Sequence, residues 1–390
     1  MFDWVGLLLK VVYYYGHLIG LSNFEFEWTG RVFKTRRSAL YAIAIDVILV
    51  ILIVLQISKP TEFNLIFGKA NKLHHYVIII VFGLRVVAGL STVFIRWSRR
   101  KQMMLLAKKV LGVFLKNPHL RKISRWGILI KVTIAIVTDL LQMAINWNAL
   151  GYAKANQTIL MALQFWVSAI VNLAVAQRYL LTLFVRAHYH LLNTELRQVI
   201  KESRMLSYHP QRRGAFMTRC CSLADQVESI AKFQSELQSI VNQLDEVFGI
   251  QGLMVYFGYY IFSIATAYIT YSILKNGHEN LELSVTSMIL SFTWCFFYFL
   301  DAILNLFNTL NLLEDHTKMI RLLEERTLFA FTLDVRLEQS VNFIQLQLIR
   351  NPFKMEIMKF FPITRSSTTA MFGSLITHSI FLIQYDMEYF

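Results

Sequence analysis

The segment from Ala162 to Val185 reads ALQFWVSAIVNLAVAQRYLLTLFV and contains one charged residue, Arg178. A helix needs about 18 or more largely apolar residues to cross roughly 30 Å of hydrocarbon, so this segment predicts a transmembrane helix. Six further segments share the pattern, and none of the seven contains a proline. We therefore predict an all-α membrane protein with seven transmembrane helices. In chain order the predicted spans are Ala39–Ile57, Tyr76–Ile95, Gly127–Trp147, Ala162–Val185, Phe248–Leu274, Ser284–Asn308 and Ser366–Tyr385.

The amino-acid composition is typical of a membrane protein. Of the 390 residues, 55% are hydrophobic and 16% are charged, and the mean hydropathy is +0.46. Soluble domains carry about 25% charged residues, and disordered chains are far less hydrophobic. Three cysteines, two of them adjacent, give neither a disulfide-built scaffold nor zinc-ligand spacing. The sequence therefore predicts no metal or cofactor site.

The net charge of +14 is unevenly distributed along the chain. Of the 39 lysines and arginines, 31 lie before the first span or between spans 2 and 3, 4 and 5, and 6 and 7, whereas 5 lie in the alternate segments. By the positive-inside rule, the N-terminus is cytoplasmic and the C-terminus extracellular. The ten basic residues between spans 2 and 3 would face the anionic inner leaflet, so the charge requires no nucleic-acid partner. Asn156, in a single Asn-x-Thr sequon, lies outside on this topology and is a glycosylation candidate.

The segments outside the spans are predicted to be partly helical. The first twenty residues lack a basic start and a small-residue cleavage site, which favours a packed or interfacial helix over a signal peptide. Apolar residues spaced by fours and threes from Phe216 to Phe248, and again from Leu333 to Leu348, favour a cytoplasmic helical bundle over plain surface helices. Asn351-Pro352 predicts the end of the second helix. Such a bundle could also hold subunits together.

This pattern divides the chain into a series of membrane and cytoplasmic parts. We predict a cytoplasmic N-terminal segment (1–38), spans 1 to 4 (39–185), a first part of a helical anchor (186–247), spans 5 and 6 (248–308), a second part of the anchor (309–365), the last span (366–385) and an extracellular tail (386–390).

Charged residues within the spans require partners, because an unpaired charge near mid-bilayer costs at least about 2.5–3.5 kcal/mol. From their depths we predict that Arg85 pairs with Asp139 or Asp46, and that Arg178 pairs with Asp301. The alternative is that one of them lines a ligand pocket or an ion path.

The sequence contains no catalytic or nucleotide-binding motif, so an enzyme is not expected. Aromatic and amide side chains instead occupy the outward halves of the predicted spans. Such groups suit a pocket for a small organic ligand, because rings bury apolar surface while polar tips orient the ligand. An interfacial aromatic belt is the alternative reading for each single residue. The candidate pocket residues are Gln142, Asn146, Trp166, Tyr268 and Trp294.

The last span contains Thr377-His378 and, after five mostly apolar residues, Gln384-Tyr385. This resembles the signature of insect gustatory receptors, in which Thr-Tyr, five mostly apolar residues and Gln-Phe lie close to the C-terminus. Thr377 and Gln384 match, whereas His378 and Tyr385 depart from the pattern. The span order and the long cytoplasmic segments also resemble this family, and the two chain ends look like those of fruit-fly members.

The resemblance implies a tetrameric, ligand-gated cation channel in the plasma membrane, in the dendrites of taste neurons. Small-molecule tastants would enter from outside, and the last helices would line the pore. By this resemblance Gln384 and Tyr385 form the gate, and Thr377 faces or supports the pore deeper in. Asp386 and Glu388 follow the gate, and in a tetramer they are expected to form acidic rings that concentrate cations.

Three other classes of membrane protein compete with this interpretation. A seven-helix G-protein-coupled receptor would need the opposite orientation, and its motifs after the third span and in the seventh are missing. A secondary transporter would need inverted repeats and helices broken near mid-membrane. An auxiliary subunit of a heteromeric taste receptor stays open, because nothing in the sequence shows that this chain forms a pore alone.

Overall fold

The computed structural model describes residues 4–389 except 23, 28–30, 34, 58–71, 117, 151–154, 209–212, 277–284, 328–333 and 358–360. Apart from two short antiparallel strand pairs, β1 with β2 and β3 with β4, its regular elements are helices. The elements are α1 (Trp4–Leu18), β1 (Glu25–Glu27), β2 (Arg31–Phe33), α2 (Arg36–Ile57), α3 (Lys72–Ser98), α4 (Arg100–Lys116), α5 (Pro118–Leu150), α6 (Ala155–Tyr208), α7 (Arg213–Asn276), α8 (Val285–Thr327), α9 (Val335–Arg350), β3 (Glu356–Ile357), β4 (Phe361–Pro362) and α10 (Arg365–Tyr389).

The predicted all-α class is confirmed. In the described part of the chain six helices are long and apolar enough to cross a membrane, namely α2, α3, α5, α6, α7 and α8, and they contain the first six predicted spans except Ser284, which lies outside the described residues. The seventh predicted span is helical within α10 but is not among these six. The reason is its composition, since α10 begins RSSTT and ends with Asp386 and Glu388. Seven spans and the orientation of the termini remain predictions.

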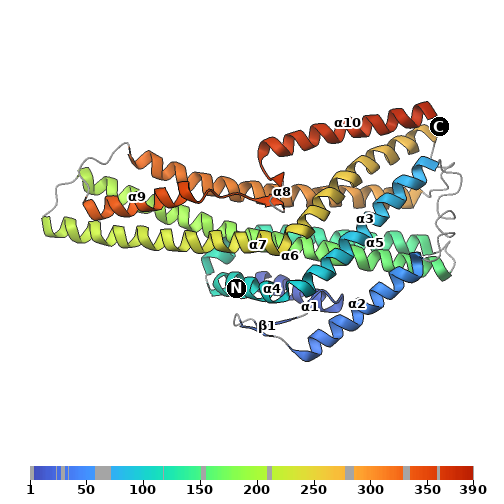
Figure 1. Cartoon of the computed structure of the whole chain (residues 1–390), viewed down its shortest axis with the longest axis horizontal. Coiled ribbons are helices and arrows are strands. Elements are labelled where there is room, and N and C mark those ends of the chain that lie inside the picture. Colours follow the sequence, from blue (N-terminus) through green and yellow to red (C-terminus); the bar gives the residue numbers. More distant parts are fainter. Residues whose placement is uncertain are drawn as a thin grey trace.

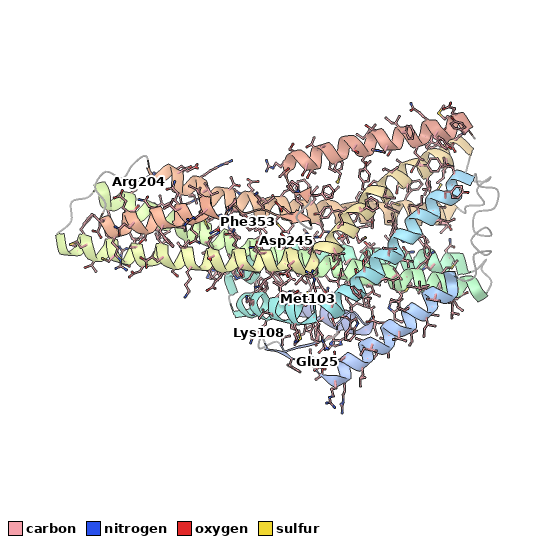
Figure 2. The ribbon with its side chains drawn as sticks, viewed as in Figure 1. Glu25, Met103, Lys108, Arg204, Asp245 and Phe353 are labelled. Atoms are coloured by element: carbon pink, nitrogen blue, oxygen red, sulfur yellow. The ribbon has the colours of Figure 1, made fainter. Side chains whose placement is uncertain are left out.

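Three long helices set the shape of the molecule. In Figure 1, α6, α7 and α8 continue beyond the predicted spans and form a narrow stalk together with α9. The other end is wide, and the C-terminus lies there, whereas α1 lies beside the junction of the two parts. Figure 2 labels Arg204 toward the free end of the stalk and Asp245 near its base. α7 is one unbroken helix of 64 residues, as the absence of proline predicts.

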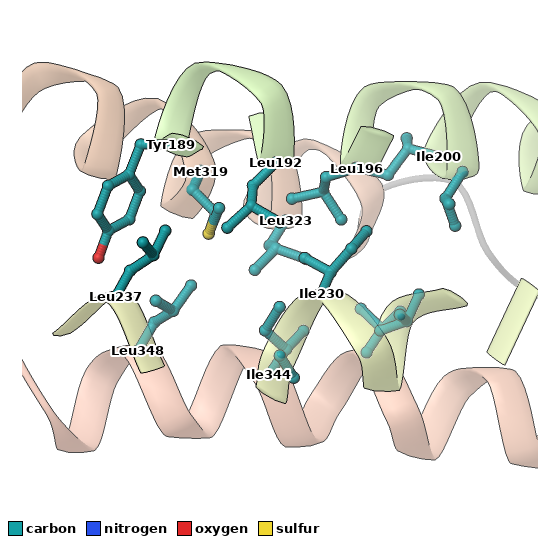
Figure 3. Packing of buried hydrophobic residues seen from close by; sticks show 14 of the residues in the cluster. Tyr189, Leu192, Leu196, Ile200, Ile230, Leu237, Met319, Leu323, Ile344 and Leu348 are labelled. Atoms are coloured by element: carbon teal, nitrogen blue, oxygen red, sulfur yellow. The ribbon is translucent and has the colours of Figure 1, made fainter. Parts of the chain in front are cut away.

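The core of the stalk confirms the two predicted apolar seams. Residues of the first seam from Cys220 to Val241 on α7, and of the second from Leu337 to Leu348 on α9, are buried in one cluster with residues of α6 and α8. Figure 3 shows this packing, with Leu192 and Leu196 of α6 opposite Met319 and Leu323 of α8. Leu333, the first residue of the second seam, lies outside the described residues. The stalk is therefore a four-helix bundle within one chain.

The end of α9 follows the sequence prediction. The Asn351 N–H donates to the Gln347 carbonyl oxygen at 3.0 Å, and Pro352 has no N–H with which to continue the helix. The chain then runs through β3 and β4, which pair Glu356 with Pro362, and enters α10.

The basic connection between spans 2 and 3 contains a helix that the sequence reasoning missed. In α4, Met103, Leu106 and Val110 are buried against residues of α1 and α6, whereas Lys101 and Lys108 are exposed. Figure 2 labels Lys108 on this helix. The spacing of three and four between the buried residues was the signal for an amphipathic helix, and the ten positive charges obscured it.

A glycine brings α3 close to α6 near the middle of the spans. A Cβ added at Gly89 would lie 2.7 Å from Val167 Cγ1 of α6, a distance that real Cβ atoms do not reach. Small residues allow such close helix packing in lipid. One turn earlier on the same face of α3 is Arg85, whose guanidinium thereby reaches α6 at Ser168.

Candidate ligand-binding site

Arg85 extends from α3 into a group of aromatic rings. Its guanidinium carbon lies 4.7 Å from the centroid of the Trp294 ring and 5.8 Å from that of Phe262. Its Nη1 atom lies 3.5 Å from Ser168 Oγ, at the outer limit of a hydrogen bond. Cation–π contacts of this kind partly compensate a charge that has left water.

The rings around Arg85 pack against one another and come from α7 and α8. Trp294 and Tyr298 are stacked with centroids 5.2 Å apart, and Phe262 meets Trp294 edge to face at 5.5 Å. The spacing of four residues between Trp294 and Tyr298 places both on one face of α8. Trp294 is 7% exposed, and its Nε1 donor has no hydrogen-bond partner among the residues that the structure describes.

A cavity of about 50 Å³ opens beside this group, between α3, α6, α7 and α8. Its walls include Arg85, Asn172, Gly258, Phe262 and Tyr298. One water molecule needs at least about 10–15 Å³ on the same measure, so the cavity has room for a few waters or a small ligand group. Mostly apolar walls with a few convergent polar groups are typical of small-molecule sites.

A smaller cavity of about 20 Å³ shares Val175, Val255 and Tyr259 with the first. Its walls include Arg178 and Gln251, whose buried side-chain nitrogen has no hydrogen-bond partner among the described residues. The two cavities are neighbours along α7. The smaller one has room for one or two waters.

The predicted ion pairs of Arg85 and Arg178 are wrong. Among the described residues Arg85 has no carboxylate within 4 Å, because α3 packs mainly against α6 and α7 whereas Asp139 lies on α5. Asp139 instead accepts from the Tyr15 hydroxyl at 2.8 Å and from Asn172 at 2.9 Å. Asp46 accepts from the Trp97 indole at 2.6 Å.

Lys131 of α5 takes the place predicted for Arg178 as the partner of Asp301. Its Nζ lies 2.5 Å from the Asp301 carboxylate, which also accepts from the Tyr259 hydroxyl at 3.2 Å. Arg178 faces α7, where it lies over the Tyr256 ring at 5.9 Å and occupies the space that a side chain at Gly252 would need. Depth in the bilayer therefore indicated the level of each charge but not the side of the helix on which it lies.

The five candidate pocket residues are not gathered in one place. Gln142 and Asn146 lie at the contact of α5 with α6, where Asn146 donates to the Met161 carbonyl at 3.2 Å. Trp166 donates to the Ile19 carbonyl at 3.2 Å and belongs to a cluster with α1 and α2. Tyr268 joins α7 to α10. Of the five, Trp294 is the one that contacts Arg85 beside the cavity.

The gate residues expected on α10 lie on its open side. Thr377 and Gln384 are exposed, and Tyr385 is 42% exposed, with its ring 4.7 Å from the ring of Tyr389. His378, which departs from the family signature, lies 3.0 Å from the Tyr260 hydroxyl of α7. The roles of these residues in a pore stay predictions.

Asp386 is not an open acid at the end of α10, which corrects the expected acidic ring. Its side chain is buried and accepts from the Tyr268 hydroxyl at 3.0 Å and from Lys275 Nζ at 3.0 Å. The sequence around Asp386 did not reveal these contacts, because both partners are more than 100 residues away along the chain. Glu388 is exposed, and its part in an acidic ring stays a prediction.

Two further features concern the glycosylation candidate Asn156 and metal-binding groups. Asn156 lies in the first turn of α6, and its side chain lies outside the described residues. Over the described residues no group of three or more His, Cys, Asp or Glu side chains could hold a metal ion.

Comparison with known proteins identifies the family. The 7tm chemosensory receptor family model matches residues 9–389. Two Drosophila melanogaster relatives, named gustatory receptors 36a and 36c, are 58% and 51% identical, with 100% of both chains covered in each case.

Solved structures give the same fold. The insect olfactory receptor OR5 from Machilis hrabei matches with a TM-score of 0.64 at 12% identity, covering 98% of this chain and 100% of that one. Its complex with eugenol matches with a TM-score of 0.59 at 11% identity, over 97% and 98% of the two chains. At these identities the likeness concerns the fold alone. The family model and the full-length relatives show that the chain belongs to the insect gustatory receptors of the 7tm chemosensory receptor family.

Proposed function

We propose that this gustatory receptor is a ligand-gated cation channel of the plasma membrane, in which a small-molecule tastant opens a pore and depolarises a taste neuron. The full-length relationship to gustatory receptors carries the proposal. The likeness to an olfactory receptor whose structure holds eugenol supports small organic molecules as the ligand class.

The proposed pore is formed by α10 from each subunit of a tetramer. In support, α10 packs on its own chain mainly through α7, and within it Ser379 and Asp386 alone are buried among the described residues. Its exposed face contains Phe372, Ile376 and Ile380 at helical spacing together with Thr377 and Gln384. A helix with so little intrachain cover suits a place between subunits. The bundle of α6 to α9 would be the cytoplasmic anchor.

The proposed ligand site is the Arg85 cavity. The cavity touches Gly258 and Phe262 of α7, and α7 holds α10 through Tyr260 and Tyr268. A ligand that moves α7 would therefore also move the proposed pore helix.

Whole-cell recording from cells that express this chain alone tests the channel. A tastant panel should evoke cation currents, and Gln384→Ala at the proposed gate should change their ion selectivity or basal level. Gln198→Ala removes an exposed amide in the stalk and serves as the matched control. Currents indifferent to Gln384→Ala would contradict the gate, and currents that appear only with a second receptor would favour an auxiliary subunit.

A further inference from the structure

Arg85 carries hydrogen-bonding capacity that the described residues leave unused. A guanidinium has five N–H donors, and the protein acceptor near it is Ser168 Oγ at 3.5 Å. By contrast, Lys131 on α5 has the carboxylate of Asp301 at 2.5 Å. Leaving a charge out of water without an anionic partner is costly, so this position favours an anion from elsewhere.

The surroundings of Arg85 define the shape of such an anion. The rings of Trp294 and Phe262 lie 4.7 and 5.8 Å from the guanidinium carbon and offer apolar surface next to the charge. Trp294 Nε1 is a second buried donor, and the described part of the chain provides no acceptor for it. An acceptor group with two oxygens matches the fork of a guanidinium, and an attached apolar body matches the rings.

The cavity sets the size of the ligand. About 50 Å³ accommodates a carboxylate with a short apolar body. Gly258 forms part of the wall, and a Cβ added there would meet no heavy atom within 4 Å. A methyl group at this position would therefore reduce the free space without straining the helix packing.

We propose that the Arg85 cavity binds small organic carboxylates, with the carboxylate on the Arg85 guanidinium and the apolar body against Phe262 and Tyr298. The assignment rests on the proposed receptor function and adds the ligand class to it. Neutral analogues of the same shape bind more weakly, because an amide lacks the charge and presents one acceptor oxygen instead of two.

Ligand-induced thermal stabilisation of the purified full-length receptor in detergent tests carboxylate binding without requiring a current. The probes are acetate, propionate and butyrate, each compared with its amide. We expect at least one carboxylate to raise the unfolding temperature at lower concentrations than its amide. Arg85→Gln should weaken apparent binding about tenfold to a hundredfold, as expected for loss of a charged hydrogen-bond partner. Arg85→Lys should keep part of the effect.

Two further variants separate binding from folding. Gly258→Ala narrows the cavity and should weaken stabilisation by the larger carboxylates without lowering the unliganded unfolding temperature, because the added Cβ meets no heavy atom within 4 Å. Arg186→Gln removes a compensated arginine outside the cavity and should leave carboxylate binding intact.

Either of two results overturns the carboxylate assignment: no stabilisation by any of the three carboxylates, or equal stabilisation by acid and amide that Arg85→Gln does not change. Failure of the channel proposal would give a different result: carboxylates would bind in a way that depends on Arg85 but would evoke no current. Currents evoked by neutral compounds and indifferent to Arg85→Gln would keep the channel and reject the carboxylate.

Discussion

Lys131 and Asp301 form an ion pair inside the predicted spans, with side chains 1% and 16% exposed. Removing one partner of a buried pair leaves the other charge uncompensated, which costs about 3–5 kcal/mol. Lys131→Met should therefore lower the free energy of unfolding by about that amount, measured on the detergent-solubilised receptor. Arg219→Gln breaks an exposed ion pair with Glu202 and should lower the free energy of unfolding by only about 0–1 kcal/mol. Equal losses in the two variants would contradict the prediction, and adding Asp301→Leu to Lys131→Met should recover most of the loss.

Lys275 holds the C-terminal end of α10 through Asp386. In Lys275→Met the buried carboxylate loses this ion pair and keeps the Tyr268 hydroxyl, so α10 is held less firmly at the level of the proposed gate. We expect a larger current in the absence of ligand, recorded at matched surface expression. Lys318→Met breaks pairs in the stalk and is the matched control. A basal current that stays the same in Lys275→Met would rule out this role of the contact.

The residue-level predictions failed where they depended on helix rotation. The sequence places Arg85 and Asp139 at similar depths, but Arg85 faces α6 and α7 whereas Asp139 faces α1 and α6. Hydrophobicity around the circumference of a buried helix is too uniform to define its orientation. The membrane level of a charge could be predicted, and its partner could not.

At the scale of elements, α9 has one buried and one open face. Ile344 is 0% exposed and Ile349 is 65% exposed on the same helix. Ile344→Ala should cost about 2–5 kcal/mol of unfolding free energy, because it leaves a cavity in the stalk core. Ile349→Ala should be nearly neutral. Similar losses in chemical denaturation would mean that the open face of α9 is covered in the assembled receptor.

The close approach of α3 and α6 depends on Gly89. Gly89→Ala forces Val167 to move and should destabilise the fold by about 1–3 kcal/mol, as overpacking does. Gly83→Ala lies on the same helix, where an added Cβ meets nothing within 4 Å, and should be neutral or slightly stabilising. Thermal unfolding of the two variants measures the difference. If Gly83→Ala lost as much stability as Gly89→Ala, the role assigned to Gly89 would be refuted.

The elements themselves were largely predictable because their signals are long and repeated. The stalk seams of α7 and α9 are periodic over several turns, and the proline at 352 ends α9 where expected. α4 was missed because a short amphipathic pattern was hidden among basic residues. The level of α10 in the membrane is harder to read, since its serines and threonines dilute the apolar signal.

For the whole molecule, the distribution of basic residues predicts a topology that can be measured. An epitope tag on the C-terminus should be accessible to antibody in intact cells. A tag on the N-terminus should become accessible only after the cells are permeabilised. The physical reason is the excess of lysine and arginine on one side of the spans. The reverse pattern would exclude this orientation and reopen the G-protein-coupled class.

The candidate site was predictable in kind but not in place. Aromatic and amide side chains in the outward halves of the spans did indicate a pocket, and Trp294 lies beside one. The other four candidates are distributed over separate helix contacts, because three-dimensional proximity depends on which helices are neighbours. That information is carried by packing of small residues such as Gly89 and not by hydropathy.

The unbroken course of α7 has a mechanical consequence. α7 bends where it leaves the stalk (Figure 1), and beyond Val241 it is still held by Leu244, Val247 and Phe248 in the second core cluster. At about 1.5 Å per residue, Phe262 lies about 21 Å and Lys275 about 41 Å beyond Phe248 along the helix. If this part of α7 tilts as one body about Phe248, a displacement at the cavity wall is multiplied about 1.9-fold at the contact with α10. Distances between spin labels at the two levels, with and without ligand, would measure this gain, and a lever arm of this length would let a small ligand do work on a distant pore.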